Sequence, residues 1–136
     1  MVYARSGKVL LLRRADHPDF WQSVTGSMHW DEQQPHQTAL RELEEETGLR
    51  VSPPALLDLG LIQRFPILPQ WRGRYAPDVL ENIEHAFALE LVQEAPITLA
   101  PREHSEYAWF GFDDAQRKVS SWTNREAIRQ LQQGIR

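Results

Sequence analysis

The chain has 136 residues, of which 41% are hydrophobic and 25% are charged, and its formal net charge is −4. A chain of this size and composition suits one globular domain with an ordinary core, and its negative balance argues against a broad nucleic-acid surface. It contains no cysteine, which excludes disulfides, thiolate metal sites and cysteine nucleophiles.

The sequence shows no signal for export or membrane insertion. No apolar run approaches the ~20 residues that span a bilayer. The first residues meet a polar break too early for a signal peptide. We therefore expect a cytoplasmic protein, and the absence of cysteine is compatible with that location.

The start of the chain contains short apolar runs separated by turns. Residues 1–4 read as a strand already under way, so this strand is expected to be short or clipped at its start. Residues 8–14, KVLLLRR, predict a buried strand that ends in two arginines. After a turn at Pro18, residues 20–27 predict another strand that leads into a polar loop.

A helix follows this loop. From His36 to Thr47 the apolar residues take a helical spacing, which predicts one helix. Pro35 suits its first turn, and Gly48 suits its C-terminal end.

The second half of the chain is dominated by strands. Residues 56–65, 83–92 and 106–112 predict three of them. The segment 66–79 between the first two is rich in proline, tryptophan and arginine, and a loop of that kind is typical of a functional segment. Strands outnumber helices in a mixed order, which predicts an α/β or α+β domain with a mixed sheet between helices.

A second helix is expected at the C-terminal end. Thr123 and Glu126 have the spacing of a capping box. The buried stripe of this helix is expected to consist of Ala127, Ile128, Leu131 and Ile135.

The first helix carries a dense group of carboxylates. At about 100° per residue, Glu42, Glu45 and Glu46 share a narrow arc that borders the apolar face, whereas Glu44 points away. Like charges at this spacing cost roughly 0.2–0.5 kcal/mol per pair in open solvent, and beside a core some of their pKa values are expected to rise. A hard divalent cation such as Mg²⁺ or Mn²⁺ would remove that repulsion. A plain solvated glutamate-rich helix remains the alternative.

Residues 41–49, RELEEETGL, preceded by Gly26, resemble the Nudix box, whose second half reads R-E-U-x-E-E-x-G-U with U apolar. The resemblance implies an α/β/α sandwich over residues 1–136 and Mg²⁺-dependent hydrolysis of nucleoside diphosphates linked to another group. The first half of the box departs from the family pattern. Glu32 has the expected spacing from Gly26 but not from Arg41, and Gln33 is the other residue that fits this loop position.

Further blocks extend the resemblance from about Arg13 to Ile128. Residues 16–27, 74–77 and 121–128 are similar to the branch of the family that hydrolyses dihydroneopterin triphosphate to the monophosphate and pyrophosphate, an early step of folate synthesis. That branch normally begins several residues earlier with a basic residue near the substrate. We therefore expect either an unfilled contact or a truncated start here.

The resemblance assigns metal binding and catalysis to the acidic residues. Glu42 and Glu46 would be primary metal ligands, Glu45 a further ligand or a support through water, and Glu103 a ligand from outside the box. Glu45 or Glu46 would take the proton from the attacking water. Arg41 would orient a neighbouring carboxylate, with a plain surface ion pair as the alternative.

The resemblance also assigns substrate contacts. Arg13 is the first candidate to bind the phosphates, and Arg14 is the second. Each expected contact also has a structural alternative, such as a surface charge, core packing or a helix cap. Trp21 and Trp30 would either stack on a heterocycle or anchor the core. The expected substrate-binding residues are Arg13, Thr25, Phe65 with its neighbours 66–68, His104 and Ser121.

Two other functions remain open at this stage. The chain could act on ordinary or oxidised nucleoside triphosphates, or it could be a Nudix module that senses a nucleotide without hydrolysing it. The intact helix carboxylates count against the sensing module, while the irregular first half of the box favours it mildly. In each case the expected partner is a small molecule rather than nucleic acid or a membrane, and the protein is expected to be a monomer or a homodimer.

Overall fold

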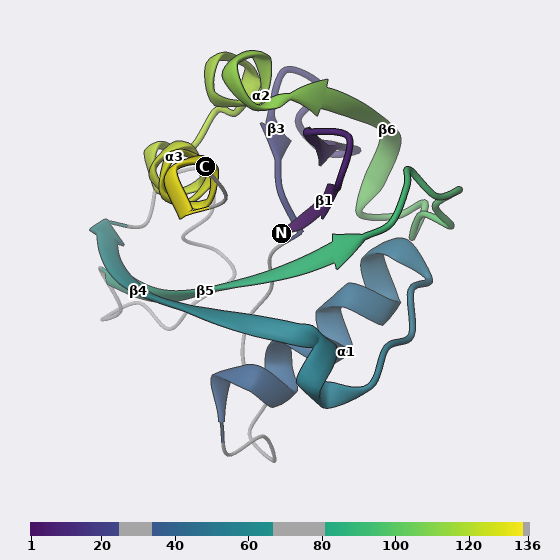
Figure 1. Ribbon diagram of the computed structural model, residues 1–136. Helices are drawn as coiled ribbons and strands as arrows, with labels where there is room; N and C mark the ends of the chain where they lie inside the picture. The colour runs from purple at the N-terminus through teal and green to yellow at the C-terminus, as the bar shows by residue number, and fades with distance from the viewer. Residues whose placement is uncertain (25–33, 67–80, 135–136) are drawn as a thin grey trace.

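The computed structural model describes residues 1–24, 34–66 and 81–134 (Figure 1). Its centre is a mixed, six-stranded sheet. Helix α1 covers one face, and helices α2 and α3 cover the other. The predicted layered fold is therefore confirmed. The elements are β1 (Val2–Ala4), β2 (Lys8–Arg14), β3 (Trp21–Gln22), α1 (Pro35–Thr47), a short 3₁₀ turn η1 (Pro53–Ala55), β4 (Leu56–Pro66), β5 (Glu81–Leu91), β6 (His104–Gly111), α2 (Phe112–Lys118) and α3 (Trp122–Gly134).

Strand β2 organises the sheet. It pairs antiparallel with β6 along one edge, and along the other edge with β1 at its start and β3 at its end. Strand β1 pairs parallel with β5, and β5 pairs antiparallel with β4. Strands β1 and β3 thus lie end to end beside β2.

The sheet splits where β1 begins. Strand β5 pairs with β1 from Leu89 onward, and the Met1 amino group donates to the Phe87 carbonyl at 2.7 Å. Among the described residues, the part of β5 before Phe87 has no partner strand on that side. The two halves of the sheet therefore separate between β5 and β3.

The first turn of α3 bridges the two halves. On one side, Asn124 Oδ1 accepts a hydrogen bond from the Ser23 amide at 2.8 Å, just after β3. On the other, Gln63 Nε2 of β4 donates to the Thr123 carbonyl at 3.0 Å. Both contacts are buried, so they fix the start of α3 over the opening.

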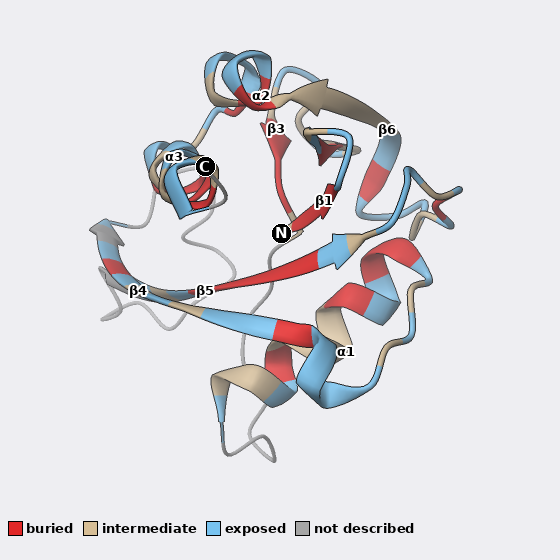
Figure 2. Cartoon of the chain, viewed as in Figure 1, coloured by how far each residue is buried: buried red, intermediate tan, exposed pale blue. Residues whose placement is uncertain are grey.

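Apolar side chains fill the space on both faces of the sheet. Along β2, Val9 and Leu11 face α2 and α3, while Leu10 and Leu12 face α1. All four are completely buried because a strand covered on both faces is apolar throughout rather than alternating. Figure 2 shows this burial concentrated in the central strands and on the inner faces of the helices.

Helix α1 has the predicted bounds. Pro35 stands in its first turn, and the side chains of Gln34 and Gln37 cap the helix reciprocally. Leu43 and Thr47 are buried against the sheet. The helix ends at Gly48, whose φ of 76° is the left-handed conformation that favours glycine.

The sequence analysis missed features at the end of the chain. Helix α2 was not predicted because the apolar run of β6 continues into Phe112, which is buried as a helical residue. The predicted capping box is wrong, since α3 begins at Trp122 and the Thr123 hydroxyl contacts the side chains of Ser121 and Glu84. The predicted stripe of Ala127, Ile128 and Leu131 is confirmed by their burial. Ile135 and the segment 67–80 lie outside the described residues.

The strand bounds also differ from the sequence analysis, by one or two residues in β1, β4 and β5 and more informatively in β3 and β6. The strand expected at residues 20–27 is described only as Trp21–Gln22. The strand expected from residue 106 begins at His104, because its pairing with β2 extends to Arg14 across a shift in register. This earlier start places His104 on the sheet. No helix among the described residues is long and apolar enough to cross a membrane.

Replacing Gly48 with alanine should destabilise the fold more than the same change at Gly60. Both glycines have positive φ, 76° and 68°, which should cost a side chain about 1 to 3 kcal/mol. A Cβ at position 48 would also lie 3.0 Å from Thr98 Cβ, whereas one at position 60 meets nothing within 4 Å. Urea unfolding of both variants measures the difference. Equal losses would show that the contact with Thr98 has no energetic weight.

Candidate metal and substrate site

The site begins with a buried carboxylate in the last turn of α1. Glu46 is only 1% exposed because the turn that points Leu43 into the core also turns Glu46 toward the sheet. Its Oε2 atom has no hydrogen-bond partner. Burial, followed by the charges of Glu42 and Glu103, raises the pKa of Glu46 to about 10. In the absence of a cation, this group therefore holds its proton at neutral pH.

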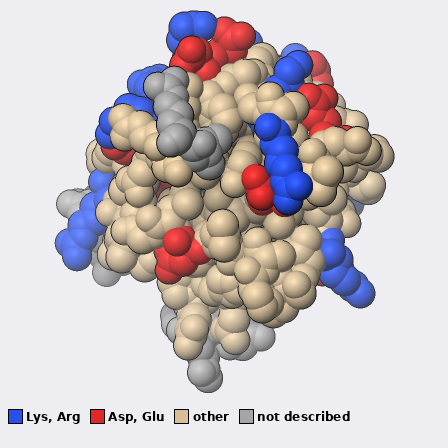
Figure 3. Space-filling model, viewed as in Figure 1, with Lys and Arg blue, Asp and Glu red and all other residues tan. Residues whose placement is uncertain are grey.

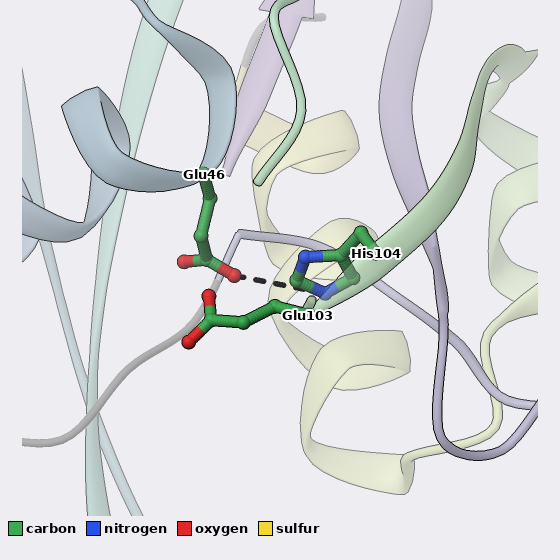
Figure 4. Close-up of side chains that lie close together, drawn as sticks. All are labelled: Glu46, Glu103 and His104. Carbon is green, nitrogen blue, oxygen red and sulfur yellow. Dashed lines mark ion pairs between the residues drawn. The ribbon is translucent and has the colours of Figure 1, made fainter. Parts of the chain in front are cut away.

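Two further side chains reach Glu46 from the start of β6 (Figure 4). The amides of Glu103 and His104 both donate to the Ala100 carbonyl at 3.0 Å, which fixes the turn into the strand. His104 Nε2 lies 3.7 Å from Glu46 Oε1. Glu46, Glu103 and His104 each offer one ligand atom, and these atoms lie within 4.8 Å of one another. Residues distant in sequence thus meet at one point.

His104 is neutral at physiological pH. Burial, with a smaller effect from the charge of Arg14, lowers its pKa to about 4. Its Nε2 atom lies 3.1 Å from Gln22 Nε2 of β3, and its Nδ1 atom has no partner. Because the Gln22 amide nitrogen can only donate, Nε2 holds the lone pair of the neutral ring and Nδ1 carries its proton. Binding of a metal through this lone pair would displace Gln22.

The other carboxylates of α1 become more exposed away from Glu46. The Glu42 side chain is 12% exposed, while that of Glu45 is 49% exposed. Arg41 Nη1 contacts both, at 2.6 Å to Glu42 and 3.1 Å to Glu45. Burial raises the pKa of Glu42, and Arg41 opposes that shift. The predicted rise in pKa beside the core is therefore confirmed for Glu42 and Glu46.

These residues fit a divalent cation. The Glu46 Oε2 atom is buried without a partner, and burying such an atom costs free energy unless a ligand satisfies it. Carboxylate oxygens suit hard cations, and imidazole nitrogen suits several transition metals. Of the four carboxylates expected to bind metal, Glu46 and Glu103 belong to the close group, whereas Glu42 adjoins Glu46 and Glu45 stands at the solvent edge.

The two expected phosphate-binding arginines end strand β2 and differ in their relation to this group. Arg13 is held by Glu106 at 3.2 Å and by Ser105 at 3.3 Å, both on β6. Arg14 bonds Asp16 and is close enough to His104 to lower its pKa. Of the two arginines, Arg14 is therefore the one whose charge acts on His104. On the face seen in Figure 3, the described lysine and arginine side chains are scattered and often stand beside acidic ones.

The remaining expected contacts divide into described and undescribed residues. Ser121 precedes α3, and its hydroxyl lies 2.7 Å from Thr123 Oγ1. Trp21 is in the core, edge-on to Phe110 at 5.7 Å, which confirms the anchoring alternative. Four expected residues, Thr25, Trp30, Glu32 and Gln33, lie outside the described residues. The side chain of Phe65 is not described either.

Two residues of this region were not singled out from the sequence. Gln22 is 6% exposed and contacts His104 across the strands. Glu84 of β5 accepts a hydrogen bond from Thr123. Each lies in an ordinary strand sequence with no motif of its own, so only the pairing of distant segments reveals them.

The fold and the acidic centre are those of a known class. The model of the NUDIX domain matches residues 1–131, so the chain belongs to the Nudix family.

Individual members of the family are also similar to this chain. Dihydroneopterin triphosphate diphosphatase of Escherichia coli (strain K12) is 42% identical over 134 residues, covering 96% of this chain and 87% of that protein. The protein of the same name from Haemophilus influenzae is 39% identical over 132 residues, covering 95% and 82%. The solved structure of the E. coli dihydroneopterin triphosphate pyrophosphohydrolase has a TM-score of 0.89 and 41% identity, covering 96% of this chain and 89% of that one.

Replacing Glu46 with glutamine should stabilise the metal-free protein. The folded state holds a proton that the unfolded chain releases above its ordinary pKa of 4.5. The stability of the unsubstituted protein is therefore fully present below that pH and falls as the pH rises toward 10. We expect a gain of about 1 to 3 kcal/mol at pH 8, together with a flatter pH dependence. Urea unfolding in EDTA measures both quantities.

The matched control is Glu44→Gln on the same helix. Glu44 is exposed and pairs with Arg50 at 2.8 Å, so its substitution should change stability by less than about 1 kcal/mol. Identical pH profiles for all three proteins would contradict the assignment of the buried proton to Glu46.

Proposed function

We propose that the protein is a divalent-cation-dependent pyrophosphohydrolase that converts dihydroneopterin triphosphate to dihydroneopterin monophosphate and pyrophosphate. The observation that carries this proposal is the meeting of Glu46, Glu103 and a neutral His104 within 4.8 Å. The choice of this substrate is supported by two relatives, 42% and 39% identical, that are named dihydroneopterin triphosphate diphosphatase.

The proposed cation is Mg²⁺, with Mn²⁺ as a substitute. Glu46 and Glu103 would hold it, with Glu42 beside them and Glu45 as a further ligand or support. When bound, the cation offsets the charge of the phosphate oxygens and lowers the pKa of the attacking water. The unpartnered Glu46 Oε2 atom and the carboxylate-rich donor set support a hard cation.

The side chains of the site bring about the displacement itself. Water attacks the α-phosphorus, its proton passes to Glu45 or Glu46, and the bond from that phosphorus to the bridging oxygen breaks, so that pyrophosphate leaves. Glu46 is shielded from solvent, whereas Glu45 can return the proton to bulk water because half of its side chain is exposed. Arg41 would keep Glu42 and Glu45 apart and oriented.

The substrate contacts follow from their positions around this centre. Arg13 would bind the phosphates after releasing Glu106, and Arg14 would add positive charge beside His104. The proposed contacts to the rest of the substrate are Thr25, Phe65, His104 and Ser121. We further propose that residues 1–136 act as one domain in the cytoplasm, as a monomer or a homodimer.

A panel of triphosphates tests the activity. With Mg²⁺, the protein should release pyrophosphate from dihydroneopterin triphosphate more efficiently than from any common or oxidised nucleoside triphosphate. Glu46→Gln and Glu103→Gln should lower kcat by several orders of magnitude, because each removes a charge from the metal centre. Pyrophosphate release is measured by a coupled assay, with Glu44→Gln as the control. Full activity of Glu46→Gln would refute the site.

Arg41→Gln tests the orienting role separately. We expect the Mg²⁺ concentration for half-maximal activity to rise about 10- to 100-fold, with a smaller change in the rate at saturating Mg²⁺. The cause would be the loss of contacts at 2.6 Å and 3.1 Å that hold Glu42 and Glu45. A metal titration that matches the unsubstituted protein would show that Arg41 is only a surface partner.

A further inference from the structure

A second carboxylate lies at the open edge of β5, away from the metal ligands. Glu84 is paired in register with Gln63 of β4, so both side chains rise on the same face of the sheet. Burial raises the pKa of Glu84, and a hydrogen bond from Thr123 opposes that shift. No described lysine, arginine or histidine side chain forms an ion pair with it. The Met1 ammonium also opposes this shift in pKa. Because Glu84 is only partly buried, a hydrogen-bond donor of a bound ligand can reach it.

A chain of hydroxyl groups fixes one oxygen of this carboxylate. Thr123 Oγ1 donates to Glu84 Oε2 at 3.3 Å. Because threonine has a single hydroxyl proton, Ser121 must donate to Thr123 across the 2.7 Å contact when Glu84 is ionised. No hydrogen bond among the described residues reaches the other oxygen, Oε1. The carboxylate is thus oriented but retains acceptor capacity.

Glu84 borders the same opening as the metal centre. The Met1 amino group lies at the split in the sheet, and burial lowers its pKa to about 6. Glu84 belongs to the stretch of β5 before Phe87 that has no described partner strand on this side, and it is bonded by Thr123 from the turn of α3 that covers the opening. The Met1 amino group is within electrostatic reach of both Glu84 and Glu46. A ligand with its phosphates at Glu46 would extend its other end along the split toward Glu84.

We propose that Glu84 determines specificity by accepting hydrogen bonds from the heterocycle of the substrate. This inference rests on the proposed function and adds the group that recognises the ring. A pterin presents a ring N–H beside an exocyclic amino group, and the two oxygens of a carboxylate match such a pair of donors. Guanine has the same pair, whereas adenine presents a donor beside an acceptor, and the acceptor repels the carboxylate.

The decisive variant is Glu84→Gln, which keeps the shape but replaces one acceptor with a donor. We expect kcat/KM for dihydroneopterin triphosphate and GTP to fall about 10- to 100-fold, mainly through KM. Hydrolysis of ATP should rise rather than fall, because the glutamine amide can donate to the adenine acceptor that the carboxylate repels. The control is Glu90→Gln on the same strand, where an exposed carboxylate pairs with Arg5 at 3.6 Å.

A second arm changes the ligand instead of the protein. Inosine triphosphate lacks the exocyclic amino group of GTP, so the unsubstituted protein should prefer GTP by about tenfold, and Glu84→Gln should lose this preference. Binding of neopterin monophosphate in EDTA, followed by pterin fluorescence, gives a readout free of metal and catalysis. We expect neopterin monophosphate to bind the unsubstituted protein more tightly than the Glu84→Gln variant.

The outcomes separate the two proposals. If the unsubstituted protein releases no pyrophosphate from dihydroneopterin triphosphate, the proposed function fails, and the role of Glu84 fails with it. If the protein is active but does not distinguish GTP from inosine triphosphate, or if Glu84→Gln loses activity equally on ATP, only the role of Glu84 is overturned. A selective loss on dihydroneopterin triphosphate and GTP would establish it.

Discussion

The burial of the Glu46 carboxylate is the constraint on which the site depends. A helix that only had to pack against the sheet would place an apolar residue there, and its neighbours Leu43 and Thr47 are buried without difficulty. Glu46 instead keeps an unpartnered oxygen beside Glu103 and a neutral imidazole. A bound cation would remove the free-energy cost of this arrangement. The proposed site therefore lowers the stability of the metal-free protein and raises the affinity for the cation.

The split in the sheet gives the substrate its proposed path. Strand β1 is too short to fill the space between β2 and β5, so β3 takes its place beside β2 and leaves the early part of β5 open. The first turn of α3 closes over this gap through Thr123 and Asn124. Carboxyl groups therefore stand at both ends of the proposed path, with Glu46 at the end proposed to bind the metal and Glu84 at the other.

Much of the fold could be predicted from local patterns, whereas much of the site could not. Helix α1 was predictable to its last residue because Pro35 and Gly48 act within one turn of the chain. The arc of carboxylates followed from helical geometry, including the exposed position of Glu44. In contrast, the contact between Gln22 and His104 joins residues 82 positions apart, and the bond between Thr123 and Glu84 joins two distant elements. Such contacts depend on strand pairing, which no local pattern specifies.

The end of α1 is bonded to the segment that carries the other residues of the proposed metal centre. The Thr98 amide donates to the Thr47 carbonyl at 2.9 Å, and Gly48 faces the Thr98 side chain so closely that an added Cβ would lie 3.0 Å from it. Glu103 and His104 follow a few residues later along the same segment. A graft of the acidic helix into another scaffold would therefore have to carry residues 97–104 with it. The transferable unit is this pair of segments rather than the helix alone.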